Sequence, residues 1–237
     1  MKKPSPQRVA ELNQGAESTN LMEVLSIDFN QLLFNTLQLT SEPMSGGILQ
    51  RMQASCSLLI KHFDFTYIYE LRSHPNDTIR GIVCYAIAQQ SLPLAEKIKL
   101  MLPLADDANA GVREWAWLSL RPYVAEELNN AIKLLGPLTL HSSERIRRFA
   151  AEITRPRGVW CASIKQLRTA PQLALIIIEP LKTDASLYVQ KSVGNWLNDA
   201  AKDHPSWVEQ ITQKWLEESP HKSTHYIAKR ALRSLKK

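Results

Sequence analysis

One pattern occurs five times in the chain: HPNDTIRGIVCYAIAQQ (74–90), LADDANAGVREWAWLSLRPYV (104–124), LTLHSSERIRRFAAEIT (138–154), LKTDASLYVQKSVGNWLNDAAK (181–202) and SPHKSTHYIAKRALRSL (219–235). In each copy a turn with Pro, Asp, Asn or Ser precedes a β-branched residue, often followed by a basic one, and then an apolar helical face. The aligned β-branched residues stand 33, 34, 43 and 38 positions apart, and they are Ile79, Val112, Ile146, Val189 and Ile227. Repeats of this length are typical of helical-hairpin solenoids.

Shorter apolar segments between the copies supply the partner helix of each pair. They are residues 92–102, 128–135, 162–167 with 174–178, and 207–216. We therefore predict an all-α fold, a HEAT-like repeat solenoid. Residues 1–20 are polar and are expected to be flexible. Residues 21–237 are expected to form a single domain, with an atypical N-terminal cap (21–71, helices near 27–37 and 48–62) and repeats over 72–237.

Composition narrows the classes of protein to consider. A chain of 237 residues can bury one core unaided, and 13 Pro against 8 Gly suit short helices better than hairpins. Its three cysteines contain no CxxC pair, which argues against a disulfide framework or a zinc knuckle. There is no run of eighteen apolar residues and no signal peptide after the Met-Lys-Lys start. We expect a monomeric, cytoplasmic protein without membrane contact.

Positive charge is concentrated in the repeats. The net charge is +6, and residues 71–237 hold 24 Lys and Arg against 16 Asp and Glu. Such an excess favours a polyanionic partner, because each neutralised phosphate releases counterions.

The third repeat places Arg145, Arg148, Glu152 and Arg155 along one helical face. With Arg147 and Arg157 the local count reaches five arginines in thirteen residues, and arginine suits forked phosphate contacts. A solvated face with an Arg148–Glu152 pair explains the same pattern, and the residues alone do not separate the two interpretations.

Two other repeats carry polar sets inside apolar patterns. Glu114, Trp117 and Arg121 share a face of the second repeat, where a carboxylate beside an indole could hold a cationic base or simply meet solvent. In the fourth, Ser192, Asn195 and Asp199 share a face with Lys191 and Lys202 at its margin. Poor helix formers grouped in this way indicate either a site or a local structural hydrogen bond.

Other chemistries lack a motif. The sequence has no P-loop, GxGxxG, GxSxG or HExxH. His221 and His225 stand four apart, but no nearby Cys completes a metal site. We predict no metal and no cofactor.

Three stretches carry a resemblance to a known group: RRFAAEITRPRGVWC (147–161), YVQKSVGNWLNDAAKDHP (188–205) and KRALRSLKK (229–237). Over about residues 70–237 the chain resembles the HEAT-like AlkC and AlkD families of bacterial DNA alkylation-repair glycosylases. It looks closer to the AlkC branch, without the extra C-terminal domain of some AlkC-type proteins, since the chain ends at Lys237. Ser119 stands where the AlkD branch has an Asp.

The resemblance implies a monofunctional glycosylase that grips duplex DNA and hydrolyses the N-glycosidic bond of cationic N3- or N7-alkylated purines. It assigns catalysis to Glu152 and Asp199, and the lesion site to Glu114 and Trp160. Expected DNA contacts are Arg148, Arg155, Arg157, Lys191 and Lys202, with the three arginines as phosphate or site-ordering contacts. Two alternatives stay open: a non-catalytic DNA-binding relative, and a repeat scaffold that binds another protein.

Overall fold

The repeated segments form helices, as the sequence predicts. In the computed structural model, which describes residues 3–235, the five copies are α6 (Asp77–Gln89), α8 (Ala110–Glu126), α10 (Glu144–Ile153), α13 (Leu187–Ala200) and α15 (Lys222–Ala231). Their partners are α7 (Leu94–Ala105), α9 (Leu128–Leu135), the short α11 (Lys165–Thr169) and α12 (Leu175–Ile178), and α14 (Pro205–Glu218). No strand occurs among the described residues, so the all-α repeat fold is confirmed.

The N-terminal part contains five further helices. They are α1 (Pro6–Asn13), α2 (Leu21–Ser26), α3 (Phe29–Leu37), α4 (Ile48–His62) and α5 (Phe65–Glu70). Short 3₁₀ turns link helices at η1 (Leu71–Ser73), η2 (Gly136–Leu140) and η3 (Pro171–Ala174).

The chain divides into two compact units, residues 1–120 and 121–237, with the boundary inside α8. The single repeat domain expected for residues 21–237 stays a prediction, since the neighbouring repeats of one solenoid can also divide into compact units.

Within residues 1–20, for which the composition predicted flexibility, residues 6–13 form α1. Ser5 caps the helix by accepting a hydrogen bond from the Arg8 amide, and Pro6 occupies a first-turn position. Leu12 is fully buried, and Arg8 pairs with Glu23 at 2.9 Å. A segment of polar composition therefore forms a capped helix whose packing depends on one buried leucine.

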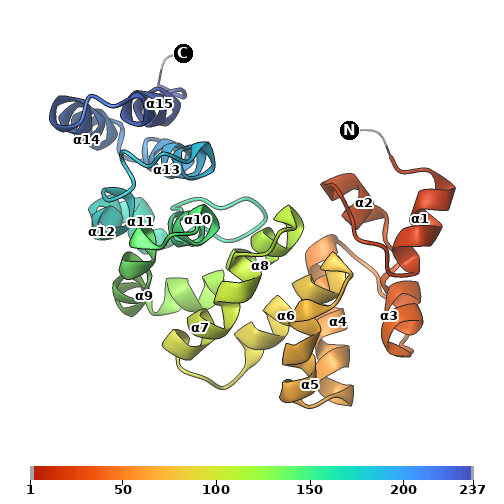
Figure 1. The fold of residues 1–237 in the computed structure, drawn as a ribbon. Coiled ribbons are helices and arrows are strands. Elements are labelled where there is room, and N and C mark those ends of the chain that lie inside the picture. Colours follow the sequence, from red (N-terminus) through yellow and green to blue (C-terminus); the bar gives the residue numbers. More distant parts are fainter. Residues whose placement is uncertain (1–2, 236–237) are drawn as a thin grey trace. The chain divides into compact units, whose positions relative to one another are not determined.

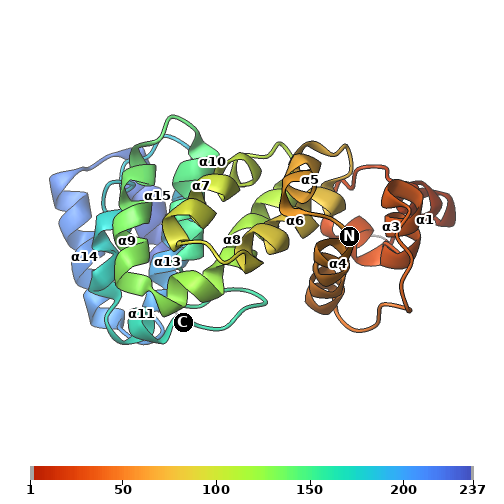
Figure 2. The same cartoon turned by 90° about the horizontal axis from the view of Figure 1, so that it is seen from below.

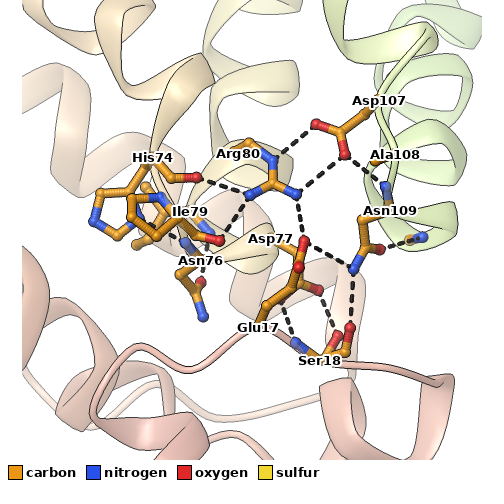
Figure 3. Close-up of polar contacts among 12 residues, drawn as sticks. Glu17, Ser18, His74, Asn76, Asp77, Ile79, Arg80, Asp107, Ala108 and Asn109 are labelled. Atoms are coloured by element: carbon orange, nitrogen blue, oxygen red, sulfur yellow. Dashed lines mark hydrogen bonds and ion pairs between the residues drawn. The ribbon is translucent and has the colours of Figure 1, made fainter.

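A buried polar cluster attaches the segment after α1 to the first repeats (Figure 3). Asp77, 1% exposed, accepts hydrogen bonds from the Ser18 amide (2.8 Å) and the Ser18 hydroxyl. Burial raises the pKa of Asp77, although the Ser18 hydrogen bonds oppose the shift. Glu17 pairs with Arg80 at 2.6 Å.

The basic residue after the β-branched one in the repeat pattern links consecutive repeats. Arg80 forks onto Asp107 (2.8 and 3.1 Å) and donates to two carbonyls of its own turn, those of His74 and Pro75. Arg147 does the same with Asp184 (2.6 and 3.0 Å) and with the carbonyls of His141 and Ser142. In the third repeat this arginine therefore has a structural role.

In the second unit the repeat helices α10, α13 and α15 lie side by side, and α9, α12 and α14 form the other layer (Figures 1 and 2). Trp196 of α13 and Trp215 of α14 are buried in its core. The Trp196 indole donates to the Thr154 carbonyl (2.9 Å), which ties α13 to the end of α10. The helices α10 and α13, together with the segments that directly follow them, carry all of the candidate site residues except Glu114.

Gly194 allows α13 and α15 to approach closely. A Cβ at this position would lie 2.8 Å from Arg230 Cβ, closer than packed carbons tolerate. We expect Gly194→Ala to lower the free energy of unfolding in urea by about 1–3 kcal/mol. Gly136→Ala is the matched control, since a Cβ there would meet Ile176 at 3.6 Å, an ordinary contact. An equal effect at both glycines would contradict this explanation.

Candidate functional site

Glu152 of α10 and Asp199 of α13 are joined by one arginine. Arg155 Nη1 lies 2.6 Å from Glu152 Oε1, and its Nε and Nη2 lie 2.8 and 2.7 Å from Asp199 Oδ2. Glu152 is 3% exposed and Asp199 4%. The adjacent packing of α10 and α13 thus brings together two carboxylates that are 47 positions apart in the chain. We call Glu152, Arg155 and Asp199 the carboxylate cluster.

Glu152 stays ionised in this buried position. Burial raises its pKa, but Arg148, Arg155 and the Ser192 hydroxyl outweigh burial, so the net shift is downward. Ser192 of α13 donates to Glu152 Oε2 at 2.5 Å, and Arg148 Nη2 lies 3.6 Å from the same oxygen. This Arg148 contact confirms the pair that the spacing predicted, but Glu152 is buried and does not lie on a solvated face.

Further cations surround the carboxylate cluster. Lys202 Nζ lies 3.4 Å from Asp199 Oδ1, and the Arg148 guanidinium stacks 4.6 Å from the centre of the Tyr188 ring. Arg230 of α15 donates to the Asn195 amide oxygen at 2.9 Å. Within residues 3–235, no carboxylate lies within ion-pair distance of Arg230.

Arg233 adds one more cation on the same side. Burial is the largest cause that lowers the pKa of Arg233, and repulsion from Arg230 lowers it further, whereas attraction to Asp199 raises it. Arg233 donates to the Arg230 carbonyl at 2.8 Å. Cations therefore outnumber the two carboxylates around the cluster, and this balance suits a polyanion.

The expected DNA-contact residues divide by exposure. The side chains of Arg148 and Arg155 are mostly buried. In the structure, Arg155 binds the carboxylates of Glu152 and Asp199. Lys191 and Lys202 are exposed on or beside α13. Arg157 is partly exposed and pairs with Asp203 at 2.7 Å.

Asp203 also pairs with Arg168 at 3.0 Å. The Arg168 hydrogen bond, helped by Arg157 and opposed by partial burial, lowers the pKa of Asp203 to about 2. Because the folded-state pKa lies below the ordinary 3.8, the stabilisation is present above pH 4 and is lost as pH falls toward 2.

We expect Asp203→Asn to lower the free energy of unfolding by about 1 kcal/mol or less at pH 6, since the pair is partly exposed. The difference from wild type should shrink to zero near pH 2. Urea unfolding at pH 6, 4, 3 and 2 measures it. A difference that stays constant over this range would rule out the ion pairs as its origin.

Trp160 lies on the loop between α10 and α11, which begins at Arg155. Its φ is +61°, a left-handed conformation that is strained for a bulky side chain. The indole is 47% exposed, and the adjacent Val159 is also exposed. The loop therefore presents an apolar pair to solvent.

Glu114 lies in the first unit, where its carboxylate accepts a hydrogen bond from the Trp117 indole at 2.8 Å. Trp117 itself is buried. The carboxylate and indole suggested by the sequence do meet, but the indole face is packed within the protein.

Sequence reasoning missed three residues of this region: Tyr188, Arg230 and Arg233. Arg230 and Arg233 stand three apart in α15 and its continuation, a spacing that places them on one side of a helix. That spacing was visible in KRALRSL, whereas the packing of α15 on α13 was not.

No group of three or more His, Cys, Asp or Glu in residues 3–235 is arranged to hold a metal ion. None of the helices there is both long enough and apolar enough to cross a membrane.

Comparisons with known proteins point to one group. Residues 80–235 match the family of DNA alkylation repair enzymes. A stretch of 119 residues is 40% identical to YhaZ of Bacillus subtilis strain 168, which covers 50% of this chain and 33% of YhaZ.

Two solved structures share the fold. The alkylpurine DNA glycosylase AlkC of Pseudomonas fluorescens, bound to DNA containing an abasic site analog, superposes with a TM-score of 0.67 at 29% identity, over 80% of this chain and 53% of AlkC. AlkD2 of Streptococcus mutans gives 0.63 at 22% identity, over 84% of this chain and 94% of AlkD2, and shows the fold alone. The chain thus spans about a third of YhaZ and about half of AlkC.

Proposed function

Because the chain belongs to the DNA alkylation repair enzyme family, we propose that it is a DNA glycosylase that releases N3- and N7-alkylated purines from duplex DNA. The observation that carries the proposal is the carboxylate cluster. Two carboxylate side chains from neighbouring repeats share one arginine, and the residues around them are mainly cationic.

The chemistry needs few groups. An alkylated purine is already a cation and a good leaving group, so the protein must stabilise the positive charge that develops on the sugar and orient a water. We assign these tasks to Glu152 and Asp199. Water adds to the sugar carbon, the glycosidic bond breaks, and the base leaves as a neutral molecule while a carboxylate takes the proton of the water.

DNA binding is assigned to the exposed cations. The proposed phosphate contacts are Lys191, Lys202 and the partly exposed Arg157. Arg148, whose guanidinium stacks on the Tyr188 ring, is proposed to support them. Trp160 is proposed to contact the lesion through its exposed ring, where an indole favours a cationic base. For Glu114 the assignment to the lesion rests on the resemblance alone.

The low exposure of both carboxylates favours a second candidate, a relative that binds damaged duplex DNA without catalysis. In that case the cluster is an ion-pair network between α10 and α13. The two candidates differ in the products that they leave.

The test is incubation of the purified protein with methylated duplex DNA, followed by chromatography of free bases and by strand cleavage at abasic sites. Release of 3-methyladenine or 7-methylguanine supports the glycosylase. Salt-sensitive binding of the duplex without base release supports the non-catalytic reader. Absence of both activities would overturn the two candidates together.

A further inference from the structure

Arg121, in the α8 segment of the second unit, is a buried cation that donates to three backbone carbonyls and also lies against the Cys161 thiol. Arg121 is 2% exposed. Its Nη1 donates to the Ile153 carbonyl (2.8 Å), its Nη2 to the Arg155 carbonyl (2.6 Å) and its Nε to the Ala162 carbonyl (3.3 Å). A buried guanidinium is costly, so three aligned acceptors indicate a specific structural requirement.

The three carbonyls bracket one loop. Ile153 ends α10, where the last carbonyls of a helix have no partner within it, and Arg155 and Ala162 lie near the two ends of the loop that follows. The Ile164 amide donates to the Pro156 carbonyl at 3.0 Å and closes the loop.

The loop also wraps tightly around the guanidinium. A Cβ at Gly158 would lie 3.3 Å from Arg121 Cζ and would overlap Cys161 Sγ. A side chain at position 158 would therefore require both Cys161 and Arg121 to shift.

This loop carries two residues of the proposed site. Arg155, at its start, links Glu152 to Asp199, and Trp160 presents its ring in a strained conformation. A left-handed tryptophan persists only where surrounding contacts hold the backbone. The contacts to the Arg155 and Ala162 carbonyls, one on each side of Trp160, supply such a hold.

We propose that Arg121 is a positioning residue: its buried guanidinium holds the loop over residues 155–162, and so sets the orientation of both Arg155 and Trp160. Its effect on turnover rests on the proposed glycosylase function. Its effect on the loop does not.

The experiment compares Arg121→Met and Arg121→Lys with Arg147→Met, all in the full chain. Arg147 is the matched control, because it also donates to two carbonyls of a turn in the same unit but not to this loop. Without DNA, amide hydrogen exchange over residues 155–164 and the fluorescence of Trp160 are recorded, the latter as the difference from the same variant carrying Trp160→Phe.

We expect exchange in the loop to become at least about tenfold faster in Arg121→Met, and Trp160 emission to shift to the red, with neither change in Arg147→Met. Arg121→Lys keeps the positive charge but lacks the planar set of N–H donors of the guanidinium, so it should also loosen the loop. With methylated DNA, kcat should fall about 10- to 100-fold in both Arg121 variants, while binding of undamaged duplex changes less than about threefold.

Loop exchange and Trp160 emission that match wild type in both Arg121 variants would overturn the proposal. Equal loosening in Arg147→Met would overturn it as well, since the effect would then be general destabilisation. If wild type releases no base but the loop loosens as expected, the positioning role stands and the glycosylase assignment fails.

Discussion

Asp199→Asn is expected to lower the rate of base release from methylated duplex DNA by about 10²- to 10³-fold, the usual loss when one charge-stabilising group is removed from a reacting centre. Asn keeps the volume and an oxygen that accepts from Arg155, but it cannot carry the negative charge that stabilises an oxocarbenium ion. Single-turnover release of 3-methyladenine measures the effect, and a filter-binding assay shows whether DNA affinity is retained.

The matched control for this loss is Asp184→Asn. Both aspartates are buried in the second unit, with side chains 6% (Asp199) and 5% (Asp184) exposed, and both accept from the Nε and Nη2 atoms of one arginine. The two variants should therefore lose similar stability, while only Asp199→Asn loses activity. Full activity in an Asp199→Asn, Glu152→Gln double variant would remove the catalytic assignment.

Arg155→Met is expected to give the largest loss of stability, about 3–5 kcal/mol at neutral pH, because it leaves two buried carboxylates without their shared cation. Urea unfolding of the full chain, followed by circular dichroism, measures it. Base release should fall as well, since the carboxylates lose their fixed orientation.

The pH dependence of this loss identifies its origin. In wild type the net downward shift of the Glu152 pKa means that its contribution to stability is present above the ordinary value of 4.5 and is lost as pH falls. Without Arg155, Glu152 keeps the longer Arg148 contact and the Ser192 hydrogen bond, but its buried charge is costly while it is ionised. The difference between Arg155→Met and wild type should therefore shrink as pH falls from 7 to 4.

A neutral triple variant separates charge from packing. Arg155→Met combined with Glu152→Gln and Asp199→Asn should recover most of the lost stability, because the two buried carboxylate charges are then removed together with their shared cation. A triple variant as unstable as Arg155→Met would instead assign the loss to missing van der Waals contacts of the arginine stem.

Much of the fold could be read from local patterns. The 33- to 43-residue recurrence of the aligned β-branched residues predicted the solenoid, and the predicted helix over 48–62 coincides with α4. These features depend on the helical periodicity of neighbouring residues, which is present in the sequence itself. The capped helix α1 was missed because its burial rests mainly on one residue, Leu12.

The site roles of Glu152, Asp199 and Arg155 stay predictions. The patterns and the family resemblance selected these three residues, with Arg155 as a phosphate or site-ordering contact. Its assignment to two carboxylates follows from the packing of α10 on α13, which leaves little water near the cluster and makes an unpaired charge costly. Burial of that kind is a property of the assembled layers and not of any one helix.

Periodicity and charge along the chain were thus sufficient to predict the repeat helices, their pairing and the residue types available for chemistry. The packing of the helices established which cations remain exposed, which arginine joins the carboxylates and which one holds the Trp160 loop. Those choices depend on contacts between residues tens of positions apart, such as Arg155 with Asp199 and Arg121 with Ala162, whose energies come from distance and desolvation.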